Sequence, residues 1–322
     1  MFDVVALGEL LVDFTPCPGG NNQDQTVFQA NPGGAPCNVL AMLTKLGRKT
    51  AFIGKVGQDM FGYMLRQTIQ DQGIVVDGLV SASDVNTTLA FVQLDAHGDR
   101  EFSFYRNPGA DMMLTKAEVN AALLEQARVF HFGTVSMTHQ GVREATQYAV
   151  SLAKKAGALI SFDPNLRPPL WEKMDLAREQ MRWGCGMCHV LKIELDELSF
   201  LTGCSSMEDG INVLRRDFPN LRLILVTGGK KGSWAVHDDK LVHQPTFLNV
   251  HTIDTTGAGD SFLGACLNLL VDSGSEHLTE VQLLDMLLFA NAAASIVTTR
   301  KGAIRSMPSQ EEVFALISGS QN

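Results

Sequence analysis

A glycine-rich stretch that leads into an apolar, helix-length run carries the clearest chemical pattern in the sequence. It reads Asp254-Thr-Thr-Gly-Ala-Gly-Asp-Ser-Phe-Leu-Gly264. At Gly257, Ala258 and Gly259 the small residues let backbone N–H groups approach an anion, and the positive end of the helix dipole adds to the attraction. Asp260 follows in the first helical turn, where we expect backbone donors to favour its carboxylate form.

This arrangement contains the parts that phosphoryl transfer needs. A carboxylate can accept the proton of an attacking hydroxyl while the neighbouring N–H groups hold phosphate oxygens as charge develops. We therefore predict that Asp260 acts as general base beside a Gly-Ala-Gly anion hole. Taken alone, the four residues Gly-x-Gly-Asp fit a tight helix start with an N-terminal acid equally well.

Alternating strands and helices must position this stretch. Short apolar runs predict buried strands at Val4–Leu7, Ala51–Ile53, Val129–Phe132, Ala158–Phe162, Val190–Ile193 and Leu223–Val226. Amphipathic segments between them predict helices at Asn38–Leu46, Met60–Gln72, Lys116–Ala127, Gly141–Ala156, Met207–Asp217 and Asp260–Val271. This order predicts an α/β fold with a central, mostly parallel sheet and helices on both faces.

Two regions interrupt the alternation. Val12–Asn31 is rich in Pro, Gly and Asn, and Thr87–Arg106 contains two strand-like runs around the turn Asp95-Ala-His-Gly-Asp99. We expect them to form a small β-sheet, from about 12–32 and 87–107, that stands off the main sheet. A flap of this kind suits an active site that must exclude water.

Five spaced motifs together resemble the signatures of the ribokinase/PfkB carbohydrate kinase family. They are Asn31–Asn38 with Gly54–Asp59, Ser161–Arg167, Thr227–Gly232, Asp254–Gly264 and Thr299–Ala303. They follow one another in family order over nearly the whole chain, which is far more specific than any single motif. The resemblance implies a ribokinase-like fold, one kinase domain over residues 1–322, and ATP as phosphoryl donor.

The resemblance also implies residues for the sugar side of the site. Hydroxyl groups would be bound by Asp13, Gly33, Gly34, Asn38, Asn165, Arg106 and the base Asp260, with Arg167 at the transferred phosphate. Arg suits several phosphate oxygens because its donors form a planar fork. Plainer alternatives stay open: a surface turn for Asp13, a helix cap for Asn38, a solvent-facing flap charge for Arg106 and an ion-paired Arg167.

On the ATP side, the resemblance implies a nucleotide site that adjoins the anion hole. Its residues would be Lys192, Glu197, Thr227, Gly229, Gly232, Gly257, Gly259 and Asn291. Glu197 would organise Mg²⁺ through water, although Glu194 stands where the family commonly has Asn. A monovalent cation, K⁺, would be held mostly by backbone oxygens of Asp254, Thr256, Val297, Arg300, Gly302 and Ser306.

The substrate that the resemblance favours is D-fructose, converted with ATP to fructose 6-phosphate and ADP by a fructokinase (EC 2.7.1.4). Phe104–Asp111, Asp163–Trp171 and Pro32–Pro36 are similar to fructokinases, whereas Cys37 and Leu40 depart from the usual small residues. Kinases of the same family for aminoimidazole riboside, 2-keto-3-deoxygluconate or ribose remain alternatives, because a few pocket contacts separate them. A non-catalytic, sugar-binding regulatory relative is a further alternative.

Composition limits the partners. The 322-residue chain has a formal net charge of −9, which argues against nucleic acid and anionic membrane surfaces as partners. We find no apolar run near the roughly 18 residues that span a bilayer, and expect a cytoplasmic protein with reduced cysteines. Cys185 and Cys188 form a lone Cys-x-x-Cys, for which we disfavour metal or redox chemistry. By resemblance we expect a homodimer formed through the lid.

Overall fold

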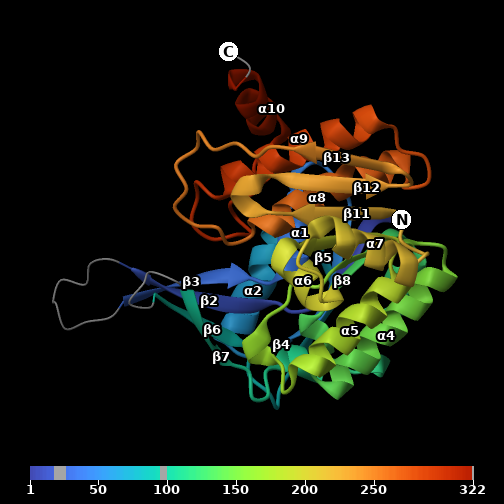
Figure 1. Ribbon diagram of the computed structural model, residues 1–322. Helices are drawn as coiled ribbons and strands as arrows, with labels where there is room; N and C mark the ends of the chain where they lie inside the picture. Colours follow the sequence, from blue (N-terminus) through green and yellow to red (C-terminus); the bar gives the residue numbers. More distant parts are fainter. Residues whose placement is uncertain (18–26, 95–99, 321–322) are drawn as a thin grey trace.

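The computed structural model describes residues 1–17, 27–94 and 100–320. Within them, the main sheet has nine strands in the order β13-β12-β11-β10-β9-β8-β1-β4-β5 (Figure 1). Its strands are β1 (Phe2–Leu7), β4 (Thr50–Gly57), β5 (Val75–Ala82), β8 (Ala127–Gly133), β9 (Leu159–Asp163), β10 (Val190–Glu194), β11 (Leu223–Thr227), β12 (Ser233–His237) and β13 (Lys240–Gln244). Only β12 and β13 run antiparallel to their neighbours. The predicted mostly parallel sheet is confirmed.

Helices cover both faces of this sheet, as predicted. One face carries α1 (Ala35–Lys45), α2 (Met60–Asp71), α8 (Ala258–Ser273), α9 (Glu280–Val297) and α10 (Gln310–Gly319). The other carries α3 (Ala121–Glu125), α4 (Gln140–Lys155), α5 (Met174–Met187), α6 (Leu195–Thr202) and α7 (Met207–Asp217). In β1, Val4 and Ala6 pack into the first core while Val5 and Leu7 pack into the second. Successive side chains alternate between faces, so a fully apolar strand serves two cores.

The predicted helix at Lys116–Ala127 is wrong. The chain instead forms a 3₁₀ turn at Lys116–Glu118 and then the short α3, and Ala127 already begins β8. Thr115 and Glu118 form a capping box around the 3₁₀ turn. Asn120 then stands as the N-cap of α3, so one helix-length segment holds two helix starts.

Helix α9 corrects the statement that no apolar run approaches membrane-spanning length. Its 18 residues are long and apolar enough to cross a bilayer, by length and composition alone. Half of this window is buried inside the protein, where Leu283, Leu287 and Ala290 belong to the core shared with α8. A buried core helix passes the same test, so α9 carries no argument for a membrane span.

A second, four-stranded sheet projects beside the main sheet, as predicted (Figure 1). Its order is β3 (Val27–Gly33), β2 (Leu11–Cys17), β6 (Leu89–Leu94) and β7 (Arg100–Tyr105). Phe14 stacks on Phe91 at 4.7 Å and meets Phe61 of α2 edge-on at 5.6 Å, which ties the small sheet to the main body. The predicted turn at Asp95–Asp99 lies outside the described residues, as does part of the predicted 12–32 segment.

Candidate active site

Two cavities meet at the start of α8, beyond the carboxyl ends of the parallel strands. This edge is where open α/β sheets bind ligands. The smaller cavity, of about 220 Å³, lies between the small sheet and the main sheet, and the larger measures about 630 Å³. Glu194, Thr255 and Gly259 line both. The loop that precedes α8 therefore separates a small compartment from a large one.

Asp260 lies in the smaller cavity and is held by Asn38 of α1. The Asn38 Nδ2 donates to Asp260 Oδ2 at 2.7 Å across the packed helices α1 and α8. The other amide atom, Asn38 Oδ1, is buried and accepts no hydrogen bond from the described residues. Buried polar atoms are normally paired, so this oxygen is a ready acceptor for a ligand hydroxyl.

The expectation that backbone donors favour the carboxylate form of Asp260 is wrong. Burial raises the pKa of its carboxyl from 3.8 to about 6, although the residue keeps some surface on the cavity. The Asn38 hydrogen bond opposes this rise in pKa, the negative charge of Asp163 adds to it, and Lys192 and Arg167 lower the pKa. Backbone donors are not among the main causes. A carboxyl group whose pKa is raised toward neutral pH is better suited to accept and return a proton.

The Gly-Ala-Gly loop forms the N-terminus of α8. Gly257 is the N-cap residue, with φ of 79°, and a Cβ there would lie 2.7 Å from the Cβ of Ala303. Ala258 N–H makes only a long hydrogen bond, 3.3 Å, to Thr255 O. A Cβ at Gly259 would lie 3.1 Å from the Lys192 ammonium. Glycine at both positions thus permits the sharp turn and the approach of a cation to the anion hole.

Three charged side chains surround the space in front of this loop. Lys192 on β10 is almost fully buried and pairs with Asp163 at 3.1 Å and with Glu194 at 3.6 Å. Arg167 is exposed, lines the smaller cavity, and forms no ion pair with any described residue. Among the described residues, its side chain donates one hydrogen bond, to Leu166 O. The Arg167 guanidinium is therefore available for an anion.

Glu194 and Glu197 differ in position. Glu197 lines neither cavity, because its oxygens accept from the backbone N–H groups of Leu166 and Glu194 at 2.7 and 2.9 Å. Burial, opposed by the Lys192 charge, raises its pKa to about 7. Glu194, which the sequence reading set aside, is 59% exposed and lines both cavities. Its place directly after the predicted strand Val190–Ile193 was the signal available in the sequence.

The larger cavity contains most of the predicted nucleotide residues. Thr227, Gly229, Gly232 and Asn291 line it, and the buried Thr227 Oγ1 has no partner among the described residues. The Asn291 amide, in contrast, is held by the protein. It donates to Gln244 O and Pro245 O at 3.0 and 3.2 Å and accepts from Ser233 Oγ at 3.0 Å. The unpaired hydroxyl of Thr227 is a contact that a ligand can complete.

Among the predicted sugar ligands, Asp13, Gly34, Asn38 and Asn165 line the smaller cavity. Gly33 does not, but a Cβ there would lie 2.3 Å from Asp13 Oδ2, so glycine makes room for that carboxylate. The cavity also contains Glu9, which sequence reasoning missed although it lies two residues after the end of β1. Glu9 accepts from Ala35 N–H at 2.8 Å, and burial raises its pKa to about 7.

Arg106 lies outside the smaller cavity. It is 7% exposed and its guanidinium pairs with buried Asp111 at 2.7 Å. It also donates to Thr138 Oγ1 at 2.8 Å and to Val135 O at 3.0 Å. Val135 does line the cavity, so this structure gives Arg106 a supporting position behind the wall. Its direct contact with sugar stays a prediction.

The predicted cation ligands converge beside the anion hole. Asp254 accepts from Thr256 N–H at 2.8 Å and from Gly302 N–H at 3.3 Å. The Arg300 guanidinium donates to Ser306 O at 3.1 Å, and Arg300 N–H donates to Val297 O at 3.0 Å. The hydroxyl of Ser306 donates to Lys301 O. The Ser306 and Val297 carbonyl oxygens already accept hydrogen bonds from Arg300, so a monovalent cation at this place stays a prediction.

Comparison with known proteins agrees with this geometry. Residues 1–310 match the family model described as pfkB family carbohydrate kinase. The chain is 44% identical over 315 residues to fructokinase-1 of Zea mays and 43% identical over 317 residues to fructokinase-2 of Solanum habrochaites. Both alignments cover 98% of this chain; they cover 97% of the Zea mays protein and 96% of the Solanum habrochaites protein.

Solved structures are similar as well. A fructokinase from Xylella fastidiosa with bound ATP matches with a TM-score of 0.91 and 30% identity over the full length of both chains. A double-mutant fructokinase from Vibrio cholerae with fructose, ADP and potassium bound matches at 0.88 and 31%, over 98% of each chain. An aminoimidazole riboside kinase from Salmonella enterica matches at 0.83 and 26%, over 98% and 99%. The chain therefore belongs to the pfkB family of carbohydrate kinases.

Proposed function

We propose that this kinase transfers the γ-phosphoryl group of ATP to D-fructose, yielding fructose 6-phosphate and ADP. The observation that carries the proposal is the position of Asp260, in a small polar cavity that opens through the anion-hole loop onto a larger one. The relatives from Zea mays and Solanum habrochaites, both named fructokinases, support fructose as the acceptor. The volume of about 220 Å³ favours a monosaccharide over a bulkier acceptor.

In the proposed reaction, Asn38 Oδ1, Asp13 and Gly34 orient the sugar so that its primary hydroxyl faces Asp260. Asp260 takes the hydroxyl proton as the new O–P bond forms, and the bond between the γ-phosphorus and the bridging oxygen of ATP breaks. Arg167 and the N–H groups of Gly257–Gly259 stabilise the transferred group. Closure of the small sheet would exclude water from this step.

The nucleotide would lie in the larger cavity, with Thr227 Oγ1, Gly229 and Gly232 against it and Asn291 shaping the wall. The Mg²⁺ that accompanies ATP keeps several waters and needs few direct protein ligands. Glu194, exposed where both cavities meet, fits this role better than Glu197, whose oxygens are used by backbone N–H groups. K⁺ would be held by the oxygens around Asp254 and Ser306 and would fix the anion-hole loop.

We also propose that residues 1–322 act as one domain, with a lid formed by about 12–32 and 87–107. The lid exposes Tyr105 and Val27, at 67% and 42%. Burial of this edge against a second copy would support a homodimer in the cytoplasm.

A substrate panel tests the proposal. Release of ADP from MgATP would be followed with fructose, ribose, glucose, 2-keto-3-deoxygluconate, adenosine and aminoimidazole riboside, each with K⁺ and with Na⁺. We expect the highest kcat/KM for fructose. Preference for another acceptor would refute the substrate while keeping the kinase, and binding of fructose without any turnover would favour a regulatory role.

A further inference from the structure

A third cavity lies at the opposite edge of the main sheet, where the parallel strands begin. Its volume is about 570 Å³, within the range of small-molecule sites. One wall contains residues at the starts of β8, β9, β10 and β11, and the other is the C-terminal end of α8. Asp260 stands near the other end of α8, about 20 Å from Ser273 along the helix. The cavity is therefore separate from the candidate active site.

Basic side chains from four different elements line this cavity. They are Arg128 of β8, Lys154 at the end of α4, His189 just before β10 and Arg222 just before β11. Backbone hydrogen bonds fix the neighbouring strand starts, since Arg222 N–H donates to His189 O at 2.8 Å and His189 N–H donates to Ile160 O at 2.8 Å. In a chain with a net charge of −9, such a cluster of basic residues creates a local positive potential that attracts an anion.

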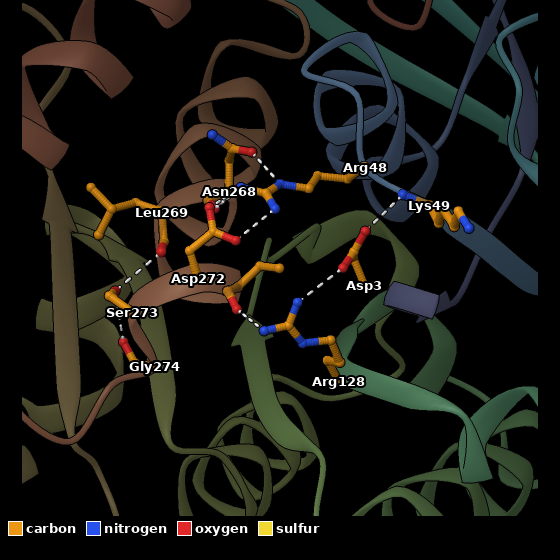
Figure 2. Close-up of polar contacts among 10 residues, drawn as sticks. Asp3, Arg48, Lys49, Arg128, Asn268, Leu269, Asp272, Ser273 and Gly274 are labelled. Atoms are coloured by element: carbon orange, nitrogen blue, oxygen red, sulfur yellow. Dashed lines mark hydrogen bonds and ion pairs between the residues drawn. The ribbon is translucent and has the colours of Figure 1, made fainter. Parts of the chain in front are cut away.

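The acidic groups nearby are already neutralised by specific partners. Arg48 binds both oxygens of Asp272, at 2.8 and 2.5 Å, and also donates to Asn268 Oδ1 at 2.6 Å (Figure 2). Asp3 accepts from Arg128 at 3.2 Å (Figure 2). Glu276 pairs with Arg222 at 3.0 Å. Lys154 forms no ion pair with any residue that the structure describes, so a positive charge is left over.

Three carbonyl groups in the last turns of α8 accept hydrogen bonds from protein donors, which weakens the main objection to an anion beside a helix C-terminus. Val271 O accepts from the Arg128 guanidinium and Leu269 O accepts from Ser273 Oγ (Figure 2). Leu270 O accepts from Gly274 N–H at 2.8 Å. The negative end of the helix is thus partly capped by protein donors.

Two hydrogen-bond donors on the lining have no partner among the described residues. His189 Nδ1 accepts from Ile160 N–H at 3.0 Å, so the proton of the neutral ring is on Nε2. Burial, with the charges of Arg222 and Lys154, lowers the His189 pKa to about 4, as expected in a positive field. Ser275 is 1% exposed, and its Oγ is a buried polar atom without a hydrogen bond. An orphan hydroxyl on the lining of a cavity that Lys154 and Arg222 also line marks a place for a ligand oxygen.

From this geometry we infer that the cavity binds a phosphate group, carried by a small phosphate monoester or by inorganic phosphate. Lys154 and Arg222 supply the charge, and His189 Nε2–H and Ser275 Oγ–H supply directional donors to its oxygens. Glu276 competes with the phosphate for Arg222. The volume exceeds that of inorganic phosphate, which favours a monoester.

Calorimetric titration of the full-length enzyme tests this inference, with the active site filled by fructose and a non-hydrolysable ATP analogue. The probes are inorganic phosphate and glycerol 3-phosphate, with glycerol as the uncharged control. We expect saturable binding of both anions, tighter for the monoester, and none of glycerol. Absence of saturable anion binding in the wild type would overturn the inference, and equal binding of the two anions would assign the site to the phosphate group alone.

Matched variants locate the site. Lys154→Ala combined with Arg222→Ala is expected to weaken binding about tenfold or more, because two charged hydrogen bonds are lost. Lys155→Ala, which removes the adjacent exposed lysine that does not line the cavity, should leave affinity unchanged. Glu276→Gln should tighten binding, since it frees Arg222. Equal losses of phosphate affinity in the Lys154/Arg222 double variant and in Lys155→Ala would mean non-specific charge attraction and would refute the site.

The orphan hydroxyl provides an independent check. Ser275→Ala should weaken phosphate binding several-fold while leaving the stability of the ligand-free enzyme unchanged or higher, because an unsatisfied polar atom is removed. Loss of stability without any change in affinity would show that Ser275 has only a structural role.

Discussion

The hydrogen bond from Asn38 to Asp260 sets the protonation of the proposed base, so its removal has a calculable effect. The bond is 2.7 Å long and lowers the pKa of a carboxyl that burial has raised to about 6. Asn38→Ala removes the donor while the carboxylate stays buried beside the negative charge of Asp163. The pKa of Asp260 should therefore rise further.

The size of the shift follows from the type of bond. A hydrogen bond to a charged group contributes about 1.5–3 kcal/mol, and one pKa unit corresponds to about 1.36 kcal/mol. Loss of the bond should raise the pKa by about 1–2 units. Because the base must be deprotonated to work, activity falls as pH drops through its pKa. The acid limb should move from about pH 6 to about pH 7 or 8.

The measurement is kcat/KM for fructose from pH 5 to 9.5, which reports the pKa values of the free enzyme. Asn165→Gly is a matched control: it removes another asparagine side chain from the same cavity, and glycine accepts the φ of 45° found there. The control should lower kcat/KM without moving the acid limb.

Two outcomes would refute this reasoning. An acid limb that stays within about 0.3 unit of wild type in Asn38→Ala would mean that the bond does not tune Asp260. A loss of activity that alkaline pH does not recover would mean that Asn38 acts only by binding substrate.

Three further predictions test the surroundings of the base. Burial raises the Glu9 pKa from 4.5 to about 7. The stability that the protonated Glu9 carboxyl contributes is therefore present at low pH and lost as pH rises through about 7. In urea unfolding, Glu9→Gln should be more stable than the wild type at pH 8, by up to about 3 kcal/mol, and similar to it at pH 4. An unchanged pH dependence would contradict the assignment. Lys192→Met leaves Asp163 buried and unpaired and should cost about 3–5 kcal/mol of unfolding free energy, largely restored by adding Asp163→Asn; failure of the second change to restore stability would count against the ion pair. Gly257→Ala should reduce kcat about 100-fold or more, whereas Gly203→Ala, with a similar φ of 74° but no atom within 4 Å, should keep full kcat in the same steady-state assay. Equal effects would attribute the loss to backbone strain alone.

The overall architecture was predictable because period and apolarity are local signals. The central strands of the main sheet are largely apolar runs; they are β1, β8, β9, β10 and β11. The predicted helices between strands repeat their apolar residues every three or four positions. Strands β5, β12 and β13 were missed, since polar residues or glycine break their apolar residues into runs of two or three. Helix α9 was missed for the opposite reason, because an apolar run buried on several sides lacks clear amphipathicity.

The site was predictable in identity but not in detail. The glycine-rich pattern indicated Asp260, and the family resemblance implied Asn38, Arg167 and Asp13; all four line the smaller cavity. The position of Arg106 was not, because its pairing with Asp111 depends on how a loop folds back behind the cavity wall. The direction of the Asp260 pKa shift was also missed, since desolvation is a property of the whole fold rather than of the neighbouring residues.

The most direct test of the account is fructose-dependent ADP release by the wild type and by Asp260→Asn, measured with ATP affinity on the same samples. The account predicts turnover of fructose to fructose 6-phosphate by the wild type. It also predicts a loss of kcat of about 10²–10⁴-fold in the variant, with ATP affinity retained. A variant that keeps kcat within about tenfold of wild type would contradict the role of Asp260, and a wild type inactive with fructose would contradict the proposed substrate.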